Sequence, residues 1–176
     1  TKKTKVSEIF KVISNYNDLS EIRYVGGCVR KILNNEKFDD IDLATNLKPN
    51  EVKECLQKNK IDFFETGIEH GTITARLDGK NFEITSLRKD VSTDGRHAKV
   101  KFSNNWKLDA SRRDFTFNSI YSDKDGNLFD PHNGKNDLDN GFVNFIGNAE
   151  TRIKEDYLRI LRYLRFFLNY SKVPHN

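Results

Sequence analysis

The segment VGGCVRKILNNEKFDDIDLAT, residues 25–45, places a glycine pair after one short apolar run and three aspartates before another. The preceding residues EIRYV have the composition of a strand, and CVRKILNN has the apolar spacing of a helix. The glycines therefore predict a turn from strand to helix. DIDLAT, residues 40–45, alternates polar and apolar side chains, which predicts a second, half-buried strand.

The aspartates of this second strand are two residues apart. On a strand, Asp40 and Asp42 project from the same face, while Ile41 and Leu43 take the opposite one. Two carboxylates this close raise each other's pKa unless a cation lies between them, and ligands that are only oxygens suit Mg²⁺. We therefore predict that Asp40 and Asp42 bind magnesium, with a merely solvated Asp-x-Asp edge as the alternative.

The glycine pair predicts a place for a phosphate. Gly26 and Gly27 leave backbone N–H groups accessible at the start of a helix, whose dipole favours an anion. Arg30 in the first turn can add a charge-assisted hydrogen bond, although a tight turn alone would also need glycine. A phosphate cradle just before two metal-binding carboxylates is an arrangement suited to a nucleoside triphosphate.

Elsewhere the chain mixes strand and helix patterns without strict alternation, which predicts an α+β layer structure. A helix is expected over residues 48–60, with Pro49 near its start. Residues 70–77 and 80–88 are expected to form a hairpin joined by an Asp-Gly turn. A short strand is expected at 100–102, and one helix from Ile153 to about Tyr170. Residues 89–99 are predicted to form a polar loop.

Composition limits the class of protein. The 176 residues, of which 36% are hydrophobic, are enough to form one domain with a small appendage. The mild net charge of +4 permits a polyanionic partner. No window approaches the roughly 18 apolar residues of a membrane span, and the first residues lack the pattern of a secretory signal. Cys28 and Cys55 form no metal-binding pair, so a reducing compartment is expected. The oligomeric state is not encoded in any pattern that we recognise.

Seven ordered motifs between about residues 23 and 167 resemble the head and neck of class II tRNA nucleotidyltransferases, the CCA-adding enzymes, and most closely the mitochondrial and alphaproteobacterial type. They are GGCVRK, DDIDLAT, HGTITARL, FEITSLRKDVSTDGRHAKVKF, SRRDFTFNSIY, LFDPHNGKNDL and EDYLRILRYLRF. The resemblance implies a DNA polymerase β-like nucleotidyltransferase head, a small mixed sheet flanked by helices, over residues 1–148. Residues 149–176 would begin a helical neck that carries the nucleobase-recognition helix, and the C-terminal body and tail of the family would be absent.

The resemblance also implies an activity: template-independent transfer of CMP and AMP from CTP and ATP to the 3′ end of tRNA, with two Mg²⁺ ions at Asp40 and Asp42. Glu83 is the candidate for a third metal-binding carboxylate, and a surface strand glutamate is the alternative. Poly(A) polymerase, an A-only or CC-only enzyme, and a catalytically silent RNA-binding module remain open. The expected location is the cytoplasm, or else the mitochondrial matrix.

In this family the segment 111–121 contacts the sugar and phosphates of the nucleotide. The implied binding residues are Arg112, Arg113, Asp114 and Asn118. On local sequence alone, a solvated arginine pair with Asp114 capping a helix is the favoured interpretation, and only the order of the motifs overturns it. Position 31 departs from the family pattern, because Lys31 stands where an aspartate is usual, and we expect lower activity from that change.

The segment 155–166 carries the predicted reading of the base. Helical spacing puts Tyr157, Ile160, Leu161, Leu164 and Leu168 on one side and Arg159, Arg162 and Arg165 on the other, with Asp156 and Arg159 as i, i+3 neighbours. An ionised Asp156 only accepts hydrogen bonds and Arg159 only donates them, so the pair complements cytosine and adenine and mismatches uracil and guanine.

The other arginines of this segment, Arg162 and Arg165, would then reach the triphosphate or the RNA end, as in the family's Glu-Asp-x-x-Arg motif. A solvated basic face with one intrahelical ion pair is the alternative. The flexible loop of the family would here include Arg88, Asp90, Asp94, Gly95 and Arg96, with Gly95 as a hinge. Its presence implies an enzyme that can add the terminal A.

Overall fold

The computed structural model describes residues 2–94 and 97–174 and contains two sheets. The larger has the strand order β3-β4-β5-β2-β1-β8-β9. Its strands are β1 (Ile22–Val25), β2 (Asp42–Thr45), β3 (Asp62–Gly67), β4 (Thr72–Leu77), β5 (Lys80–Ser86), β8 (Tyr121–Ser122) and β9 (Leu128–Phe129). The smaller is a ribbon of β6 (Arg88–Asp94) and β7 (His97–Phe102). β2 pairs antiparallel with β1 and parallel with β5, so the main sheet is mixed.

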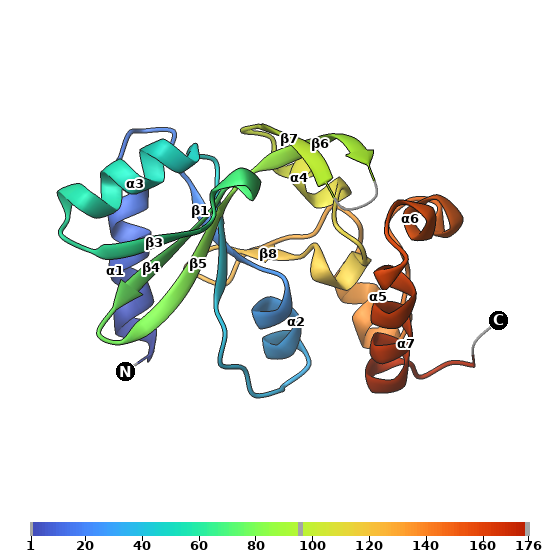
Figure 1. The fold of residues 1–176 in the computed structure, drawn as a ribbon. Helices are drawn as coiled ribbons and strands as arrows, with labels where there is room; N and C mark the ends of the chain where they lie inside the picture. The colour runs from blue at the N-terminus through green and yellow to red at the C-terminus, as the bar shows by residue number, and fades with distance from the viewer. Residues whose placement is uncertain (1, 95–96, 175–176) are drawn as a thin grey trace.

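Helices lie at both ends of the molecule (Figure 1). They are α1 (Lys2–Ser14), α2 (Gly27–Leu33), α3 (Pro49–Lys58), α4 (Trp106–Ser111), α5 (Gly134–Asn140), α6 (Ala149–Glu155) and α7 (Leu158–Tyr170), with 3₁₀ turns η1 (Ile68–His70) and η2 (Thr116–Asn118). α1 and α3 lie near the N-terminal end with β3 to β5, and α6 and α7 lie at the other end (Figure 1). Within the described residues, no helix is both long and apolar enough to cross a membrane.

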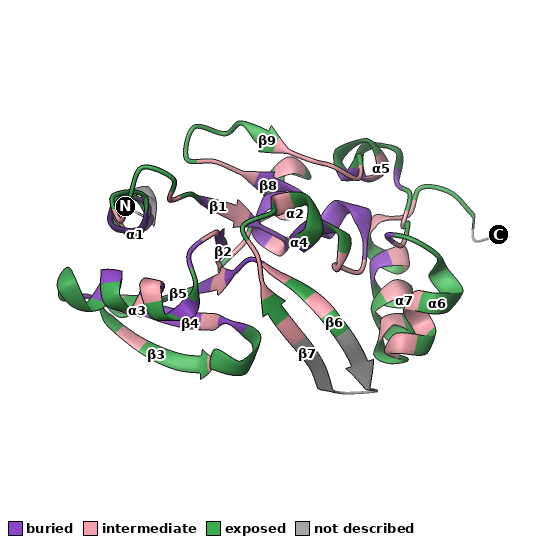
Figure 2. Cartoon of the chain, turned by 90° about the horizontal axis from the view of Figure 1, so that it is seen from above, coloured by how far each residue is buried: buried purple, intermediate pink, exposed green. Residues whose placement is uncertain are grey.

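In the described part of the chain, three apolar clusters hold these layers together, and the smallest of them packs Ala110 of α4 against Val25, Ala44 and Tyr121 of the sheet. The first joins α1 and α3 to the sheet and includes Ile9, Ile13, Leu43 and Ile84, all fully buried. The second is aromatic and joins α2, η2 and α7, with Phe115, Phe117 and Phe166 at its centre. Figure 2 shows the buried residues following the central strands and the segments beside α4. The aromatic cluster places α7 against the head, because Phe166 packs edge-on against both phenylalanines.

Most predicted elements are confirmed, and so is the α+β fold. β1 and α2 flank the glycine pair, Pro49 begins α3, and the β4–β5 turn has left-handed Asp78 and Gly79, as an Asp-Gly hairpin requires. Two expectations were wrong in detail. The strand predicted from residue 40 begins only at Asp42, and the predicted polar loop is largely the β6–β7 ribbon, whose ladder satisfies the polar backbone.

The prediction of one long helix from Ile153 is wrong, because the helix is interrupted at Asp156. α6 ends at Glu155, Asp156 is extended with φ −155° and ψ 106°, and α7 begins at Leu158. The carboxylate of Asp156 accepts the Leu158 N–H at 3.0 Å, and aspartate commonly competes with the helix ladder in this way. α6 begins at Ala149, the residue at which we place the start of the neck.

The break also changes which face of the last helix packs. The aromatic side chains Tyr163, Phe166 and Tyr170 pack against the head, and the arginines between them border the same side. The apolar residues that we placed on one side of the helix are exposed instead: Tyr157, Ile160, Leu161, Leu164 and Leu168. Large aromatic rings bury more surface than leucine side chains, so α7 packs its aromatic face against the head.

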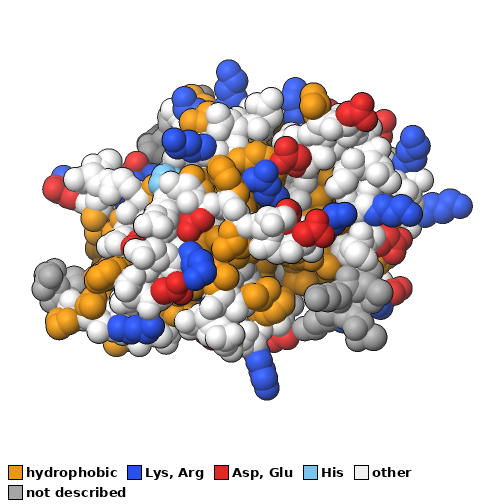
Figure 3. Space-filling view, turned by 180° about the vertical axis from the view of Figure 1, so that it is seen from behind, with side chains coloured by type: hydrophobic (Ala, Val, Ile, Leu, Met, Phe, Trp, Pro, Cys, Tyr) orange, Lys and Arg blue, Asp and Glu red, His pale blue; other side chains and the backbone are white. Residues whose placement is uncertain are grey.

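The surface carries no large patch of one charge on the face shown in Figure 3, where Lys and Arg side chains are scattered among acidic ones. This agrees with the small net charge of +4. Electrostatic attraction for a polyanion must therefore come from local concentrations of arginine rather than from the whole molecule.

Candidate active site

The residues predicted to bind a nucleotide come from three separate segments of the chain, and all of them line one cavity of about 630 Å³. The set is Gly26, Gly27, Arg30, Arg112, Arg113, Asp114, Asn118, Asp156, Arg159, Arg162 and Arg165, joined by Asp42. The volume lies within the range of small-molecule sites, roughly 300–1,000 Å³. The fold thus brings the two glycines, the acidic strand and the arginines of α7 to the same place.

Three carboxylates occupy neighbouring positions of the fold, and one of them, Asp42, lines this cavity. Asp42 is the first residue of β2, Glu83 is its direct partner on β5, and Asp40 precedes the strand. Burial raises the pKa of Asp42, the like charges of Glu83 and Asp40 raise it further, and Arg113 opposes them. The negative charge is therefore only partly neutralised by the protein, which is the condition under which a cation binds.

The donor set fits magnesium, since it consists of carboxylate oxygens only. Across residues 2–94 and 97–174, no group of three or more His, Cys, Asp or Glu side chains is placed so that it could hold a metal ion. A Mg²⁺ ion here would take the rest of its shell from water and phosphate oxygens, as this ion prefers.

The glycine turn lies beside Asp42. Gly26 has φ 73° and ψ −133°, a region that favours glycine, and a Cβ built there would lie 3.9 Å from Asp42 Oδ2. The predicted phosphate cradle therefore lies next to the first residue of the acidic strand. From α2, Gly27 and Arg30 line the cavity, whereas Lys31, which follows Arg30 in the last turn of the helix, is not part of the lining.

Arg30 is held more tightly than the sequence indicates. Its guanidinium donates to Asn118 Oδ1 and lies 4.8 Å from the ring centre of Phe166 and 5.2 Å from that of Tyr170. The side chain is 7% exposed, so the aromatic cluster fixes its orientation beside Gly27. Contact between Arg30 and a triphosphate stays a prediction.

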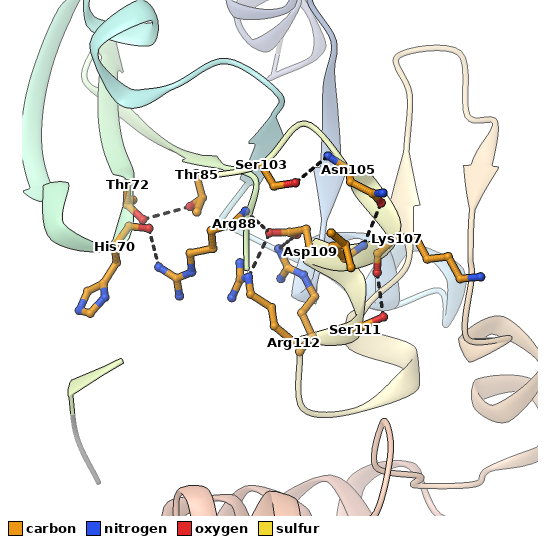
Figure 4. A network of polar contacts seen from close by, with 12 residues as sticks. His70, Thr72, Thr85, Arg88, Ser103, Asn105, Lys107, Asp109, Ser111 and Arg112 are labelled. Carbon is orange, nitrogen blue, oxygen red and sulfur yellow. Dashed lines mark hydrogen bonds and ion pairs between the residues drawn. The ribbon is translucent and has the colours of Figure 1, made fainter. Parts of the chain in front are cut away.

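A buried carboxylate that the sequence analysis missed anchors the arginine pair (Figure 4). Asp109 in α4 is 1% exposed. Its Oδ1 accepts hydrogen bonds from the backbone N–H of Arg88 at 3.1 Å and from Arg112 Nε at 3.0 Å. Its Oδ2 accepts from Arg113 Nη2 at 3.2 Å and from the Tyr121 hydroxyl at 2.6 Å. Burial opposes ionisation, but the two guanidinium groups and these hydrogen bonds outweigh it and lower the pKa of Asp109. The i, i+3 and i, i+4 spacing to the arginines was the available signal.

Arg88 ties the β6–β7 ribbon to the rest of the site. Its guanidinium donates to the carbonyl of His70 in η1, while its backbone N–H bonds Asp109 (Figure 4). Burial, with Arg112 nearby, lowers the pKa of Arg88 to about 10. Of the other residues predicted for a flexible loop, Asp90 and Asp94 belong to β6, and Gly95 and Arg96 lie outside the described residues.

On the other side of the cavity, Asp114 joins the head to α7. Arg162 Nε donates to Asp114 Oδ2 at 2.6 Å, and Asn118 Nδ2 donates to Asp114 Oδ1 at 3.3 Å. The expected Asp156–Arg159 pair is replaced: Asp156 accepts the Leu158 N–H, and Arg159 Nη1 bonds Glu155 Oε2 at 2.7 Å. Both residues still line the cavity, because the break after α6 turns them inward.

A mixed sheet that carries acidic residues beside a glycine turn, with a helical segment closing the cavity, is the nucleotidyltransferase head fold. The model of the poly A polymerase head domain matches residues 22–144, and the chain belongs to that family.

Proteins similar to this chain agree with this membership. The chain is 55% identical over 148 residues to the human CCA tRNA nucleotidyltransferase 1, mitochondrial, covering 84% of the chain and 34% of the relative. It is 43% identical over 145 residues to the CCA-adding enzyme of Oceanobacillus iheyensis, covering 81% and 35%. The chain therefore spans about a third of the length of these relatives.

The fold is also shared with solved structures. The CCA-adding enzyme of Bacillus stearothermophilus in complex with CTP superposes with a TM-score of 0.84 at 29% identity, covering 97% of this chain and 40% of that one. A tRNA nucleotidyltransferase complexed with a primer tRNA and an incoming ATP analog gives a TM-score of 0.73 at 25% identity, covering 93% and 46%.

Proposed function

We propose that this chain carries the catalytic head of a CCA-adding tRNA nucleotidyltransferase, which transfers CMP and AMP from CTP and ATP to the 3′ end of tRNA. The observation that carries the proposal is the meeting of the predicted nucleotide-binding residues with Asp42 in one cavity. The names of the relatives support it, since they include CCA-adding enzymes and a structure with CTP.

Each part of the cavity has a role in this proposal. Asp42 and Asp40, with Glu83 as the third candidate, would hold two Mg²⁺ ions, which supply charge neutralisation and a more acidic 3′-hydroxyl. The Gly26–Gly27 turn and the guanidinium groups of Arg112 and Arg113 bind the triphosphate.

A second pair of residues would bind the ribose of the nucleotide. Asp114 and Asn118 face the cavity with an acceptor and an amide, which can hold ribose hydroxyls. Arg162 of α7, which is bonded to Asp114, lies beside that ribose position. Arg165 borders the same cavity and supplies a further positive charge for the triphosphate or the RNA end.

Base selection is assigned to Asp156 and Arg159. One presents acceptors and the other donors at the edge of the same cavity, which complements cytosine and adenine. A uracil or guanine in the same place would leave polar groups unpaired, and this makes rejection steep.

The decisive experiment supplies tRNA that lacks its 3′ CCA, labelled CTP or ATP, and Mg²⁺. Addition of C, C and A supports the proposal, and a long A tail would assign poly(A) polymerase activity, which the family name makes the first alternative. Addition of A alone or CC alone would assign a partial enzyme. No incorporation, with tRNA binding retained, would identify a silent RNA-binding module.

The location proposed for the protein is the cytoplasm, with the mitochondrial matrix as the alternative. The human relative, at 55% identity, is named as mitochondrial, and the name of the bacterial relative, at 43% identity, gives no compartment. Fractionation of the source cell with detection of the protein in each compartment decides between them.

Substitution of Asp156 with alanine is expected to reduce the preference for CTP and ATP over UTP and GTP by roughly 10- to 100-fold, since a charged hydrogen bond contributes about 1.5–3 kcal/mol. Primer extension with each of the four triphosphates measures this.

Because Asp156 also caps the start of α7, Asp156→Asn is the companion variant: its amide oxygen can keep the cap while the charge is lost. Glu150→Ala, an exposed acid in α6, is the matched control. Unchanged discrimination in both Asp156 variants would contradict the base-reading role.

A further inference from the structure

Arg152 in α6 stands outside every residue set discussed so far, yet its side chain is well buried. Its guanidinium makes three hydrogen bonds: Nη2 donates to the carbonyl oxygens of Arg112 at 2.6 Å and Arg113 at 2.8 Å, and Nη1 donates to Glu155 Oε2 at 2.9 Å. Only 14% of the side chain is exposed. The Arg152 guanidinium is held this closely although Arg152 does not line the cavity, which indicates a structural role.

The two carbonyls belong to the C-terminal end of α4, which ends at Ser111 with Arg112 as its cap. The last carbonyls of a helix lack intrahelical partners and carry partial negative charge. Arg152 satisfies two of them from a different part of the chain. It therefore fixes the start of the neck against the backbone of the arginine pair.

The other end of Arg152 reaches the base-reading residue. Arg159 Nη1 donates to Glu155 Oε2 at 2.7 Å and to the main-chain carbonyl of Arg152 at 2.7 Å. The same carboxylate oxygen of Glu155 thus holds both guanidinium groups. The position of Arg159 depends on Glu155, and that of Glu155 depends on Arg152.

The phosphate side of the cavity is anchored separately. Asp109 holds the side chains of Arg112 and Arg113 through bonds in which Arg152 takes no part. Arg152 contacts only the backbone of these residues. The distance from the phosphate-binding arginines to Arg159 is therefore set by Arg152, whereas the phosphate-binding side chains are oriented by Asp109.

We propose that Arg152 is a positioning residue for base selection: it holds Arg159, through Glu155, at a fixed place relative to the triphosphate subsite. The inference rests on the proposed function and refines it. Loss of Arg152 should weaken the discrimination among bases while the triphosphate subsite keeps its affinity, a pattern that a general loss of structure would not produce.

The test measures the dissociation constants of CTP, UTP and inorganic tripolyphosphate for the wild-type chain and Arg152→Gln, by isothermal titration calorimetry with Mg²⁺. In Arg152→Gln, the ratio of CTP affinity to UTP affinity should fall about tenfold, because charge-assisted hydrogen bonds are lost. The affinity for tripolyphosphate should stay within about threefold of the wild-type value. Lys154→Gln, an exposed cation two residues away in the same helix, is the matched control and should leave both unchanged.

An unchanged CTP to UTP ratio in a folded Arg152→Gln variant would overturn the inference, and so would an equal loss of tripolyphosphate affinity. If thermal unfolding shows that this variant is not folded, Glu155→Gln decides instead, since it removes the charge that joins Arg152 and Arg159 but keeps an acceptor. Its CTP to UTP ratio should fall in the same direction, and a wild-type ratio would reject the proposal. Equal affinity of the wild-type chain for CTP and UTP would refute the base reading of the proposed function itself, and the inference with it.

Discussion

Replacing Asp42 with asparagine is expected to lower nucleotide incorporation by roughly a thousandfold or more, since a metal ion contributes several kcal/mol and each 1.36 kcal/mol is tenfold in rate. Asp42 is the one proposed ligand that also lines the cavity and lies beside the glycine turn. Asparagine keeps the shape of the side chain and removes its charge. The incorporation assay on tRNA lacking CCA, at saturating tRNA, measures the loss.

The fold should survive this change, because the substitution relieves repulsion from Glu83 and Asp40 rather than breaking an ion pair of the core. Circular dichroism and thermal unfolding of Asp42→Asn should match the wild-type chain. Asp39→Asn, an exposed carboxylate of the same segment, is the control and should keep wild-type incorporation. Incorporation by Asp42→Asn within tenfold of wild type would remove Asp42 from the catalytic role.

The glycine turn and the acidic strand could be predicted because their signals are local. A glycine pair between an apolar run and a helix pattern needs no distant partner to be recognised, and Gly26 indeed has positive φ. The pairing of Asp42 with Glu83 was a weaker expectation, because a parallel register joins residues about forty positions apart and no short pattern encodes it. The family resemblance supplied the order of motifs.

The break between α6 and α7 escaped sequence reasoning for a different reason. Residues 153–170 keep helical spacing throughout, so the periodicity gives no warning of a stop. The interruption comes from one side chain, Asp156, that bonds the Leu158 N–H, and from aromatic packing that orients α7 by Phe166. Tertiary contacts of this kind override a periodic pattern, and here they turn Arg159 towards Glu155.

Asp109→Ala should destabilise the chain by about 3–5 kcal/mol, the cost of leaving a buried partner charge uncompensated. Arg113, Arg112, Tyr121 and the Arg88 N–H would all lose their shared acceptor in a site that is almost closed to water. For a domain of this size each kcal/mol corresponds to roughly 2–4 °C, so the melting temperature should fall by about 6–20 °C. Thermal unfolding followed by circular dichroism measures the shift.

A surface pair with the same spacing supplies the control for this prediction. Asp139 pairs with Lys135 at 2.6 Å in an i, i+4 arrangement, but both side chains are about half exposed, so Asp139→Ala should change stability by less than about 0.5 kcal/mol. Because folding lowers the pKa of Asp109, its stabilisation is present above the ordinary value of 3.8 and is lost as the pH falls below it. The difference in melting temperature between wild type and Asp109→Ala should therefore shrink at low pH. A difference as small as that of Asp139→Ala at neutral pH would show that Arg112 and Arg113 are held by other contacts.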